Sequence, residues 1–306
     1  MRLIQFSACT LFLLAGCMQT ASKPTQSASA KKTVLTNVSE VLAQTTASDW
    51  REPAADNLLV MQLSSGTVIM ELAPQFAPHH ADNIRALAHE HYYDGLAILR
   101  VQENYVVQWG DPDEKREIKN AKRTIPGEFW RSISALNFTP LPDGDVYAPQ
   151  VGYSDGFAAA RNPKTGEAWL AHCYGALGVG RGMGADSGGG PELYVVIGHS
   201  PRHLDRNITV AGRVLQGMEY LTVLPRGTGA MGFYEKPEEY VTIRSLKLAS
   251  DMPAAQRPQL QVLRTDTASW DAYVDVRRNR RDSWFLDPVG HVELCNVGVP
   301  VRSKPA

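Results

Sequence analysis

The sequence lacks the motifs that mark several common enzyme classes. No segment reads G-x-G-x-x-G or G-x-x-x-x-G-K-[ST] between a strand and a helix, and the glycine-rich run at 182–190 precedes an expected strand, so we reject a nucleotide site. There is no G-x-S-x-G elbow, which argues only weakly against a serine hydrolase because a triad need not be visible in sequence. H-E-x-x-H is also missing, and we interpret the histidine pairs at 79–80 and 89–91 as exposed helix side chains rather than metal ligands.

An excess of charge of one sign is missing as well. The 306 residues carry a formal net charge of −1, which gives no electrostatic reason to expect nucleic acid or an anionic membrane surface as a partner. The one basic cluster, Arg277–Arg281, falls at the end of a helix expected over 269–285. Cations there interact favourably with the helix dipole, so we interpret the cluster as a solvated helix end.

Cysteine is scarce, with four residues in the whole chain. Cys9 lies in an expected signal peptide and Cys17 at its end, which leaves Cys173 and Cys295. No C-x-x-C occurs, so the pattern of a thioredoxin-like redox motif or a zinc knuckle is missing. Two alternatives remain open for the last pair, a disulfide in an oxidising compartment or two buried free thiols.

Residues 1–16 are interpreted as a signal peptide. Arg2 precedes an apolar run over 3–15 that is too short to span a bilayer comfortably. The run ends in L-A-G-C at 14–17, which resembles the lipobox of bacterial lipoproteins and implies cleavage before Cys17 and its acylation. The alternative is an ordinary secreted protein that is cleaved nearby.

The resemblance to a lipoprotein also predicts a location. Met18 rather than Asp follows Cys17, and by resemblance to the lipoprotein sorting rule this favours the outer membrane. We therefore expect a protein of the bacterial periplasm that meets the membrane through its lipid anchor only. Residues 17–55 are rich in Ala, Ser, Thr, Gln and Lys and are predicted to form a flexible linker, with some helix near Val41.

Short strands dominate the region 56–250. Strand-like runs at 58–63 and 67–72 flank a hairpin signal, and apolar residues at helical spacing follow from Pro78. Many short strands with only two helices predict a mainly β antiparallel barrel or sandwich, whereas a doubly wound sheet would need repeated strand–helix alternation. Residues 113–170 are expected to be a long insertion with weak periodicity, and 251–306 a separate C-terminal extension.

Several short stretches of this region share their residues and their order with one known family. In chain order they are A-P at 77–78 with Asn83, Y-D-G at 93–95, L-R-V at 99–101, Y-V-V-Q-W-G-D-P at 105–112, G-A-L-G-V-G-R at 175–181, E-L-Y-V at 192–195 and H-L-D-R-N-I-T-V-A-G-R-V at 203–214. Together they resemble the cyclophilin family of peptidyl-prolyl cis-trans isomerases. The resemblance spans about 56–250 and implies a closed eight-stranded antiparallel barrel capped by two helices.

The resemblance also implies a site and a reaction. Arg100 takes the position of the catalytic arginine, and the partners would be proline-containing polypeptides, with no cofactor, metal or nucleic acid. The implied substrate-binding residues are two aromatic residues of the proline pocket, three residues that add apolar contact and four at positions that bind or adjoin the peptide backbone: Tyr105, Tyr194, Val106, His203, Leu204, Gln108, Gly180, Arg181 and Glu192.

The chain departs from the family pattern at three of these positions. Glu192 replaces the usual Gln, and an ionised carboxylate cannot donate a hydrogen bond to a peptide. Tyr105 and Tyr194 replace Phe, and each adds a hydroxyl that needs a partner. The leading prediction is an isomerase that assists the folding of envelope proteins. The alternative is a catalytically weak cyclophilin-like module that binds proline-containing segments as a scaffold.

Overall fold

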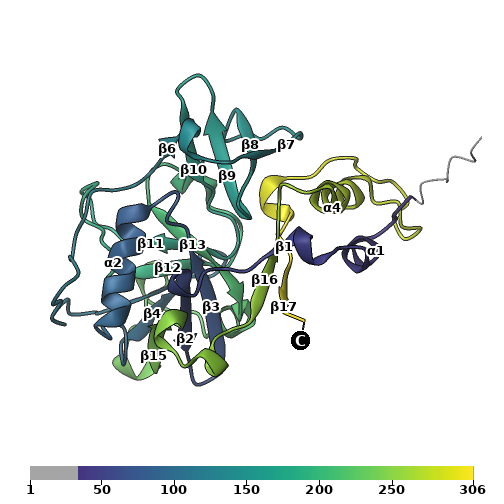
Figure 1. The fold of residues 1–306 in the computed structure, drawn as a ribbon. Helices are drawn as coiled ribbons and strands as arrows, with labels where there is room; N and C mark the ends of the chain where they lie inside the picture. Colours follow the sequence, from purple (N-terminus) through teal and green to yellow (C-terminus); the bar gives the residue numbers. More distant parts are fainter. Residues whose placement is uncertain (1–33, 306) are drawn as a thin grey trace, which may run out of the picture. The chain divides into compact units, whose positions relative to one another are not determined.

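The computed structural model describes residues 34–305 of the chain. The expected signal peptide, the expected lipidation site at Cys17 and the first part of the expected linker lie outside the described residues. From Leu35 onward the chain forms one unit, in which a large curled sheet, a smaller sheet and a helical segment can be followed in Figure 1. No helix among the described residues is long and apolar enough to cross a membrane.

The largest sheet contains nine strands in the order β14-β4-β5-β12-β11-β13-β3-β2-β15. All of its neighbouring strands are antiparallel. In chain order the strands are β2 (Leu58–Gln62), β3 (Thr67–Leu72), β4 (Ala97–Val101), β5 (Val106–Gly110), β11 (Ala176–Val179), β12 (Leu193–Val196), β13 (Val210–Gln216), β14 (Val241–Thr242) and β15 (Ser245–Leu248). The mainly β architecture predicted for 56–250 is therefore confirmed.

The closed eight-stranded barrel is not confirmed, because the sheet has nine strands and an open order. The difference lies in the last expected strand, 240–248, which the structure divides into β14 and β15. β14 pairs with β4 and β15 pairs with β2, so these consecutive segments lie at opposite ends of the strand order. Between them, the N–H of Ile243 donates to Leu96 O and the N–H of Arg244 donates to Gln62 O. The chain thus changes its partner strand within two residues.

Alternation along the strands separates the main core from a second face. In β5, Val107 and Trp109 are completely buried in the main core, whereas Val106 belongs to a different apolar cluster. The same holds in β12, where Val195 is in the main core and Tyr194 in the second cluster. Because successive side chains of a strand point to opposite faces, the predicted site residues of both strands lie on the face turned away from the main core.

Two helices accompany this sheet, α2 (Pro78–His89) and α3 (Met218–Thr222). Pro78 stands in the first turn of α2, where its missing N–H would have no helical partner anyway. The interpretation of the histidines as exposed is wrong for His80, which is buried with its Nδ1 2.8 Å from Glu128 Oε2. A carboxylate from the insertion explains this burial, because it supplies the hydrogen bond that water would otherwise make.

The insertion at 113–170 contains regular structure that the weak periodicity did not predict. It forms a second antiparallel sheet in the order β6-β10-β9-β8-β7, with β6 (Arg131–Ser132), β7 (Thr139–Leu141), β8 (Gln150–Ser154), β9 (Phe157–Asn162) and β10 (Glu167–Leu170). Asp155 and Gly156 connect β8 to β9 with positive φ angles of 49° and 86°. An Asp-Gly pair is a strong hairpin signal. The sequence pattern nevertheless does not predict the hairpin, because the flanking strand β9 is largely alanine and shows no polar–apolar alternation.

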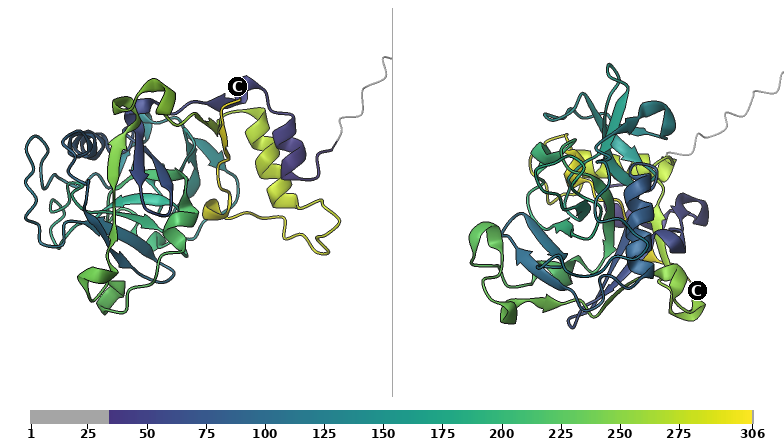
Figure 2. Two further views of the ribbon diagram at one scale, coloured as in Figure 1. Left: turned by 90° about the horizontal axis from the view of Figure 1, so that it is seen from below. Right: turned by 90° about the vertical axis from the view of Figure 1, so that its left-hand side faces the viewer.

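Both ends of the described chain pack together beside the large sheet. Helix α1 (Val38–Ala43) lies next to α4 (Ala268–Asn279) in Figures 1 and 2, and β1 (Trp50–Arg51), β16 (Leu260–Leu263) and β17 (Val301–Ser303) form a three-stranded sheet. Val41 and Trp50 are buried in the cluster that also holds Trp270. The helix predicted near Val41 is therefore confirmed. The flexible linker is not confirmed for 38–55, because distant residues of the extension supply the apolar partners that this segment lacks by itself.

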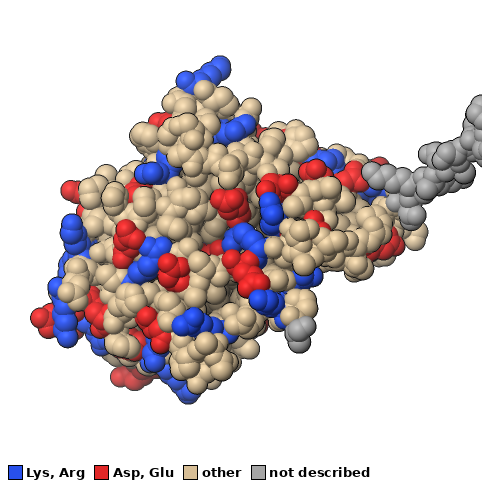
Figure 3. Space-filling model, viewed as in Figure 1, with Lys and Arg blue, Asp and Glu red and all other residues tan. Residues whose placement is uncertain are grey.

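The extension is attached to the rest of the unit by a disulfide between Cys173 and Cys295, which decides between the two alternatives left open above. The helix expected over 269–285 is present but ends at Asn279, followed by Arg280 in the left-handed conformation. Acidic and basic side chains are interspersed on the face shown in Figure 3, and no run of basic side chains crosses that face.

Candidate active site

Arg100 is held on β4 by three hydrogen bonds. Its Nε donates to the carbonyl oxygen of Met231 over 2.8 Å, its Nη1 donates to Gln108 Oε1 over 2.9 Å, and its Nη2 donates to Gln102 Oε1. The rings of Tyr105 and Phe233 lie 5.7 and 5.3 Å from its Cζ, within the range of cation–π attraction. Burial lowers the pKa of Arg100, and the neighbouring Tyr105 opposes this shift. An arginine nevertheless stays charged at neutral pH.

Gln108 links this arginine to Glu192. Its Oε1 accepts from Arg100 while its Nε2 donates to Glu192 Oε2 over 2.9 Å. The two partners require opposite ends of the amide, because Arg100 can only donate and an ionised carboxylate can only accept. Burial raises the pKa of Glu192, the nearby acidic residues add to this, and the bond from Gln108 opposes it. The resulting chain of polar contacts runs from β4 across β5 to Glu192, the residue that directly precedes β12.

Gly180 and Arg181 lie on the far side of Glu192. The N–H of Gly180 donates to the carbonyl oxygen of Glu192 over 2.9 Å, and a cavity of about 430 Å³ is lined by all three residues. Arg181 is exposed, donates from Nε to the carbonyl oxygen of Asn207, and lies 5.9 Å from the ring of Phe129 in the insertion. The structure therefore places these predicted backbone-binding residues together with Glu192.

The predicted proline pocket lies where the insertion packs on the second face of the large sheet. Val106 and Tyr194 are buried in one apolar cluster with Phe157 and Leu170 of the insertion, and Tyr105 packs against the same cluster. Strands β9 and β10 of the insertion therefore cover part of the second face of the large sheet. The insertion thus packs directly against the residues that were predicted to form the proline pocket.

The remaining predicted residues, His203 and Leu204, lie on a short 3₁₀ helix, η4 (Arg202–Leu204). His203 is exposed and Leu204 half-buried. The His203 side chain makes no hydrogen bond to Arg100, Gln108 or Glu192, and Leu204 has no polar side-chain atom. The structure therefore does not join these two residues directly to the other predicted site residues.

Several residues around the site could not be found by sequence reasoning. Met231 and Phe233, which fix Arg100, come from a loop more than a hundred residues further along the chain, and no motif marks them. His172 accepts a hydrogen bond from the hydroxyl of Tyr194. The presence of Tyr instead of Phe at this position predicts that a polar partner exists, but it does not identify that partner. Among the described residues no cluster of three or more His, Cys, Asp or Glu side chains is arranged to hold a metal ion.

Glu192→Gln should raise kcat/KM for a proline peptide at pH 7 by about two- to ten-fold, the value of one neutral hydrogen bond. The new amide keeps an oxygen for Gln108 and adds an N–H donor for the peptide backbone. Activity of the unmodified chain should rise as pH falls through the raised pKa of Glu192, because the protonated carboxyl can donate, whereas the variant should show no such rise. Parallel pH profiles of the two proteins would contradict this expectation.

The raised pKa of Glu192 also predicts how the stability of the folded protein changes with pH. Because the folded-state pKa of Glu192 lies above its ordinary value of 4.5, its contribution to stability is fully present below the unfolded-state pKa and is lost as pH rises through the folded-state value. At pH 7 the Glu192→Gln variant should therefore unfold at a higher temperature than the unmodified chain. The difference between the two unfolding temperatures should shrink near pH 4. Glu238→Gln, at an exposed carboxylate, is the matched control.

Comparison with known proteins identifies the region that carries the site. Residues 58–248 match the family model described as "Cyclophilin type peptidyl-prolyl cis-trans isomerase/CLD". The chain is 24% identical over 187 residues to a probable peptidyl-prolyl cis-trans isomerase of Brucella suis, covering 61% of this chain and 81% of that protein. It is 27% identical over 194 residues to a putative peptidyl-prolyl cis-trans isomerase of Staphylococcus saprophyticus, covering 62% and 90%.

A solved structure is similar over a larger part of the chain. The crystal structure of cyclophilin AquaCyp293 from Hirschia baltica superimposes with a TM-score of 0.67 and 25% sequence identity. It covers 88% of this chain and 98% of its own, a larger share than the residues of the family model. The likeness therefore extends beyond 58–248 into the terminal segments.

Proposed function

This chain belongs to the cyclophilin-type peptidyl-prolyl cis-trans isomerase family, and from this we propose that it accelerates rotation about X–Pro bonds with Arg100 as the catalytic residue. The observation that carries the proposal is the fixation of Arg100. Three of the five N–H donors of a guanidinium are engaged with Met231, Gln108 and Gln102. These bonds hold the guanidinium plane and leave two donors for a bound peptide.

The reaction needs little more than such a group. The barrier to rotation, about 18–20 kcal/mol, comes from amide resonance, and an unaided X–Pro bond exchanges in roughly 10–100 s. A guanidinium that donates to the prolyl nitrogen as it becomes pyramidal, or to the carbonyl oxygen, favours the twisted amide over both planar forms. Tyr105, Val106 and Tyr194 would hold the proline ring meanwhile, and no nucleophile or proton transfer is involved.

A protease-coupled isomerisation assay tests this proposal directly. The purified chain should accelerate the cis-to-trans exchange of a proline tetrapeptide in proportion to its concentration. The competing function, a catalytically weak peptide-binding module, is favoured by the half-buried carboxylate of Glu192 and by the insertion packed against Val106 and Tyr194. Binding of the peptide without acceleration would support that function and contradict an isomerase.

We further propose that the clients are envelope proteins and that the chain is an outer-membrane lipoprotein of the periplasm. The L-A-G-C sequence at 14–17 supports acylation of Cys17, and the bond between Cys173 and Cys295 suits an oxidising compartment. Cells fed labelled palmitate should incorporate it into the unmodified chain and not into Cys17→Ser. Equal labelling of both proteins would exclude Cys17 as the acylated residue.

A further inference from the structure

The hydroxyl of Tyr194 is paired inside the protein. It lies 2.9 Å from Nε2 of His172, whose side chain is completely buried and whose ring plane is nearly parallel to that of the tyrosine. Nδ1 of His172 lies 2.9 Å from Asp205 Oδ1, which also accepts from the histidine's own backbone N–H. Because the ionised carboxylate can only accept, Nδ1 carries the proton, and in the neutral imidazole Nε2 accepts from the tyrosine.

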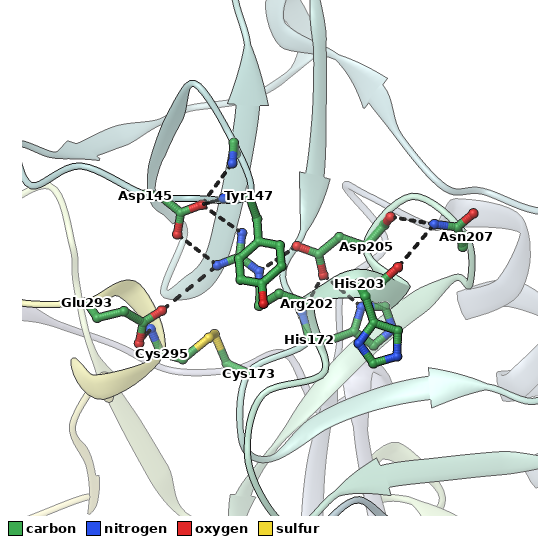
Figure 4. Close-up of polar contacts among 11 residues, drawn as sticks. Asp145, Tyr147, His172, Cys173, Arg202, His203, Asp205, Asn207, Glu293 and Cys295 are labelled. Carbon is green, nitrogen blue, oxygen red and sulfur yellow. Dashed lines mark hydrogen bonds and ion pairs between the residues drawn. A yellow bond between two sulfur atoms is a disulfide. The ribbon is translucent and has the colours of Figure 1, made fainter.

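Asp205 is in turn held by Arg202, as Figure 4 shows. Arg202 Nε donates to Asp205 Oδ2 over 2.6 Å and its Nη1 donates to Asp145 Oδ2 over 3.0 Å. All three side chains are at least nine-tenths buried. Burial alone would raise the pKa of Asp205, but the bond from His172 and the charge of Arg202 outweigh it and leave the pKa below its ordinary value. The carboxylate therefore stays ionised and keeps its two partners.

The far end of this network reaches the insertion and the C-terminal extension, which both lie outside the large sheet. Asp145 belongs to the insertion between β7 and β8, and the ring of Tyr147 lies 5.2 Å from the guanidinium of Arg202. Glu293 of the C-terminal extension approaches Arg202 to 4.0 Å, and it also accepts from the N–H of Cys295. Residues of both the insertion and the extension thus contact the guanidinium of Arg202.

The near end of the network reaches two sets of residues that were predicted to bind the proline ring, Tyr194 and the His203–Leu204 turn. Tyr194 stands on β12, and Arg202 begins η4, which continues directly into His203 and Leu204. η4 is a single turn of three residues, and the side-chain bonds of Arg202 to Asp205 and Asp145 contribute to its position. The series Tyr194–His172–Asp205–Arg202 therefore connects the ring of Tyr194 to the turn that carries His203 and Leu204 through buried hydrogen bonds.

Burying four polar side chains costs desolvation free energy that an apolar replacement would avoid, and the phenylalanine of the family pattern would fill the ring's volume at 194. A fully paired polar network specifies one arrangement more strictly than apolar packing does. We propose that His172 and Asp205 are positioning residues of the isomerase, which fix the Tyr194 ring relative to the His203–Leu204 turn and so set the shape of the proline pocket. This inference rests on the proposed function.

The proposal makes a specific kinetic prediction. The pocket holds the proline ring in the planar and the twisted states of the peptide alike, and loss of such uniform binding raises KM without lowering kcat. His172→Asn places its amide nitrogen near the position of Nδ1, so it keeps the bond to Asp205 and removes the partner of the Tyr194 hydroxyl. We expect KM to rise about three- to ten-fold, the value of one hydrogen bond, with kcat within about two-fold of the unmodified chain.

A double-mutant cycle separates positioning from general structural damage. In the Tyr194→Phe background, where the hydroxyl is missing, His172→Asn should change KM by less than two-fold, because both substitutions remove the same bond. Tyr153→Phe is the matched control, since it removes another buried tyrosine hydroxyl that bonds only to Leu294 and Val297. It should lower the unfolding temperature and leave KM unchanged.

The outcomes are distinct. Effects of His172→Asn and Tyr194→Phe on KM that multiply, or variants that lose stability as Tyr153→Phe does with an unchanged KM, overturn the inference and leave the proposed function standing. An unmodified chain without isomerase activity overturns both. Should His172→Asn fail to fold, Tyr194→Phe and Tyr153→Phe decide between them: a higher KM in the first alone supports positioning, and an equal KM in both contradicts it.

Discussion

Arg100→Ala is expected to lower kcat/KM for a proline peptide ten-fold or more while leaving the protein folded. Removing one preorganised donor to a developing charge costs about 10²–10³ in other enzymes, and Arg100 supplies the only cation that the structure places against the ring of Tyr105, among the described residues. The fold should survive because the main core does not include this side chain. The protease-coupled assay measures the loss, and circular dichroism with thermal unfolding checks the fold.

Two further variants show whether the charge or the planar donor geometry matters. Arg100→Lys keeps a positive charge but cannot present donors in a fixed plane to Met231, Gln108 and a peptide at once, so it should recover only a small part of the activity. Arg244→Ala removes an exposed arginine in the connection between β14 and β15 and should behave like the unmodified chain. Near-normal turnover of Arg100→Ala would sink the proposed mechanism.

The double substitution Cys173→Ser with Cys295→Ser should lower the free energy of unfolding by about 2–5 kcal/mol, the range found when native disulfides are removed. The bond joins residues 122 positions apart, and in the chain-entropy account a loop of about that length restricts the unfolded chain by roughly 4.7 kcal/mol. Both cysteines belong to the apolar cluster that binds the extension to the insertion. Urea unfolding of the two proteins measures the difference.

Reduction provides an independent check of the same bond. The unmodified chain treated with dithiothreitol should shift its urea midpoint toward that of the double variant, whereas the double variant should not respond to the reductant. Mass mapping of peptides under non-reducing conditions should recover the two cysteines in one linked species. Two free thiols, or a midpoint that reduction leaves unchanged, would contradict a stabilising bridge between the extension and the rest of the unit.

Most strands of the large sheet were predictable from the sequence. The runs at 58–63, 67–72 and 193–198 contain continuous or alternating apolar residues bounded by turn signals, which is information that a local window holds. Contacts between segments that are far apart in the chain were harder to predict. The segment 240–248 looks like one strand locally, and only its two partners, β4 and β2, divide it. The segment 38–55 looks like a linker because its apolar partners lie in the extension.

By itself the sequence selected the residues that we propose for the candidate site. Arg100, Gln108 and Glu192 stand at recognisable positions of short motifs, and strand alternation sets which face of its own strand each of Arg100 and Gln108 occupies. The pairing of β4 with β5 and of β5 with β12 then brings the three residues together. The sequence also determined that the hydroxyl added at Tyr194 needs a partner, because a buried donor without one is costly.

Only the tertiary structure decided who those partners are. Arg100 is held by Met231 and Phe233, and the Tyr194 hydroxyl by His172 and, through it, Asp205. These contacts join segments far apart in the chain, and a hydrogen-bond partner is set by position in space rather than by any local pattern. The insertion at the pocket wall and the disulfide of the extension follow the same rule, since both depend on which surfaces meet when the chain closes on itself.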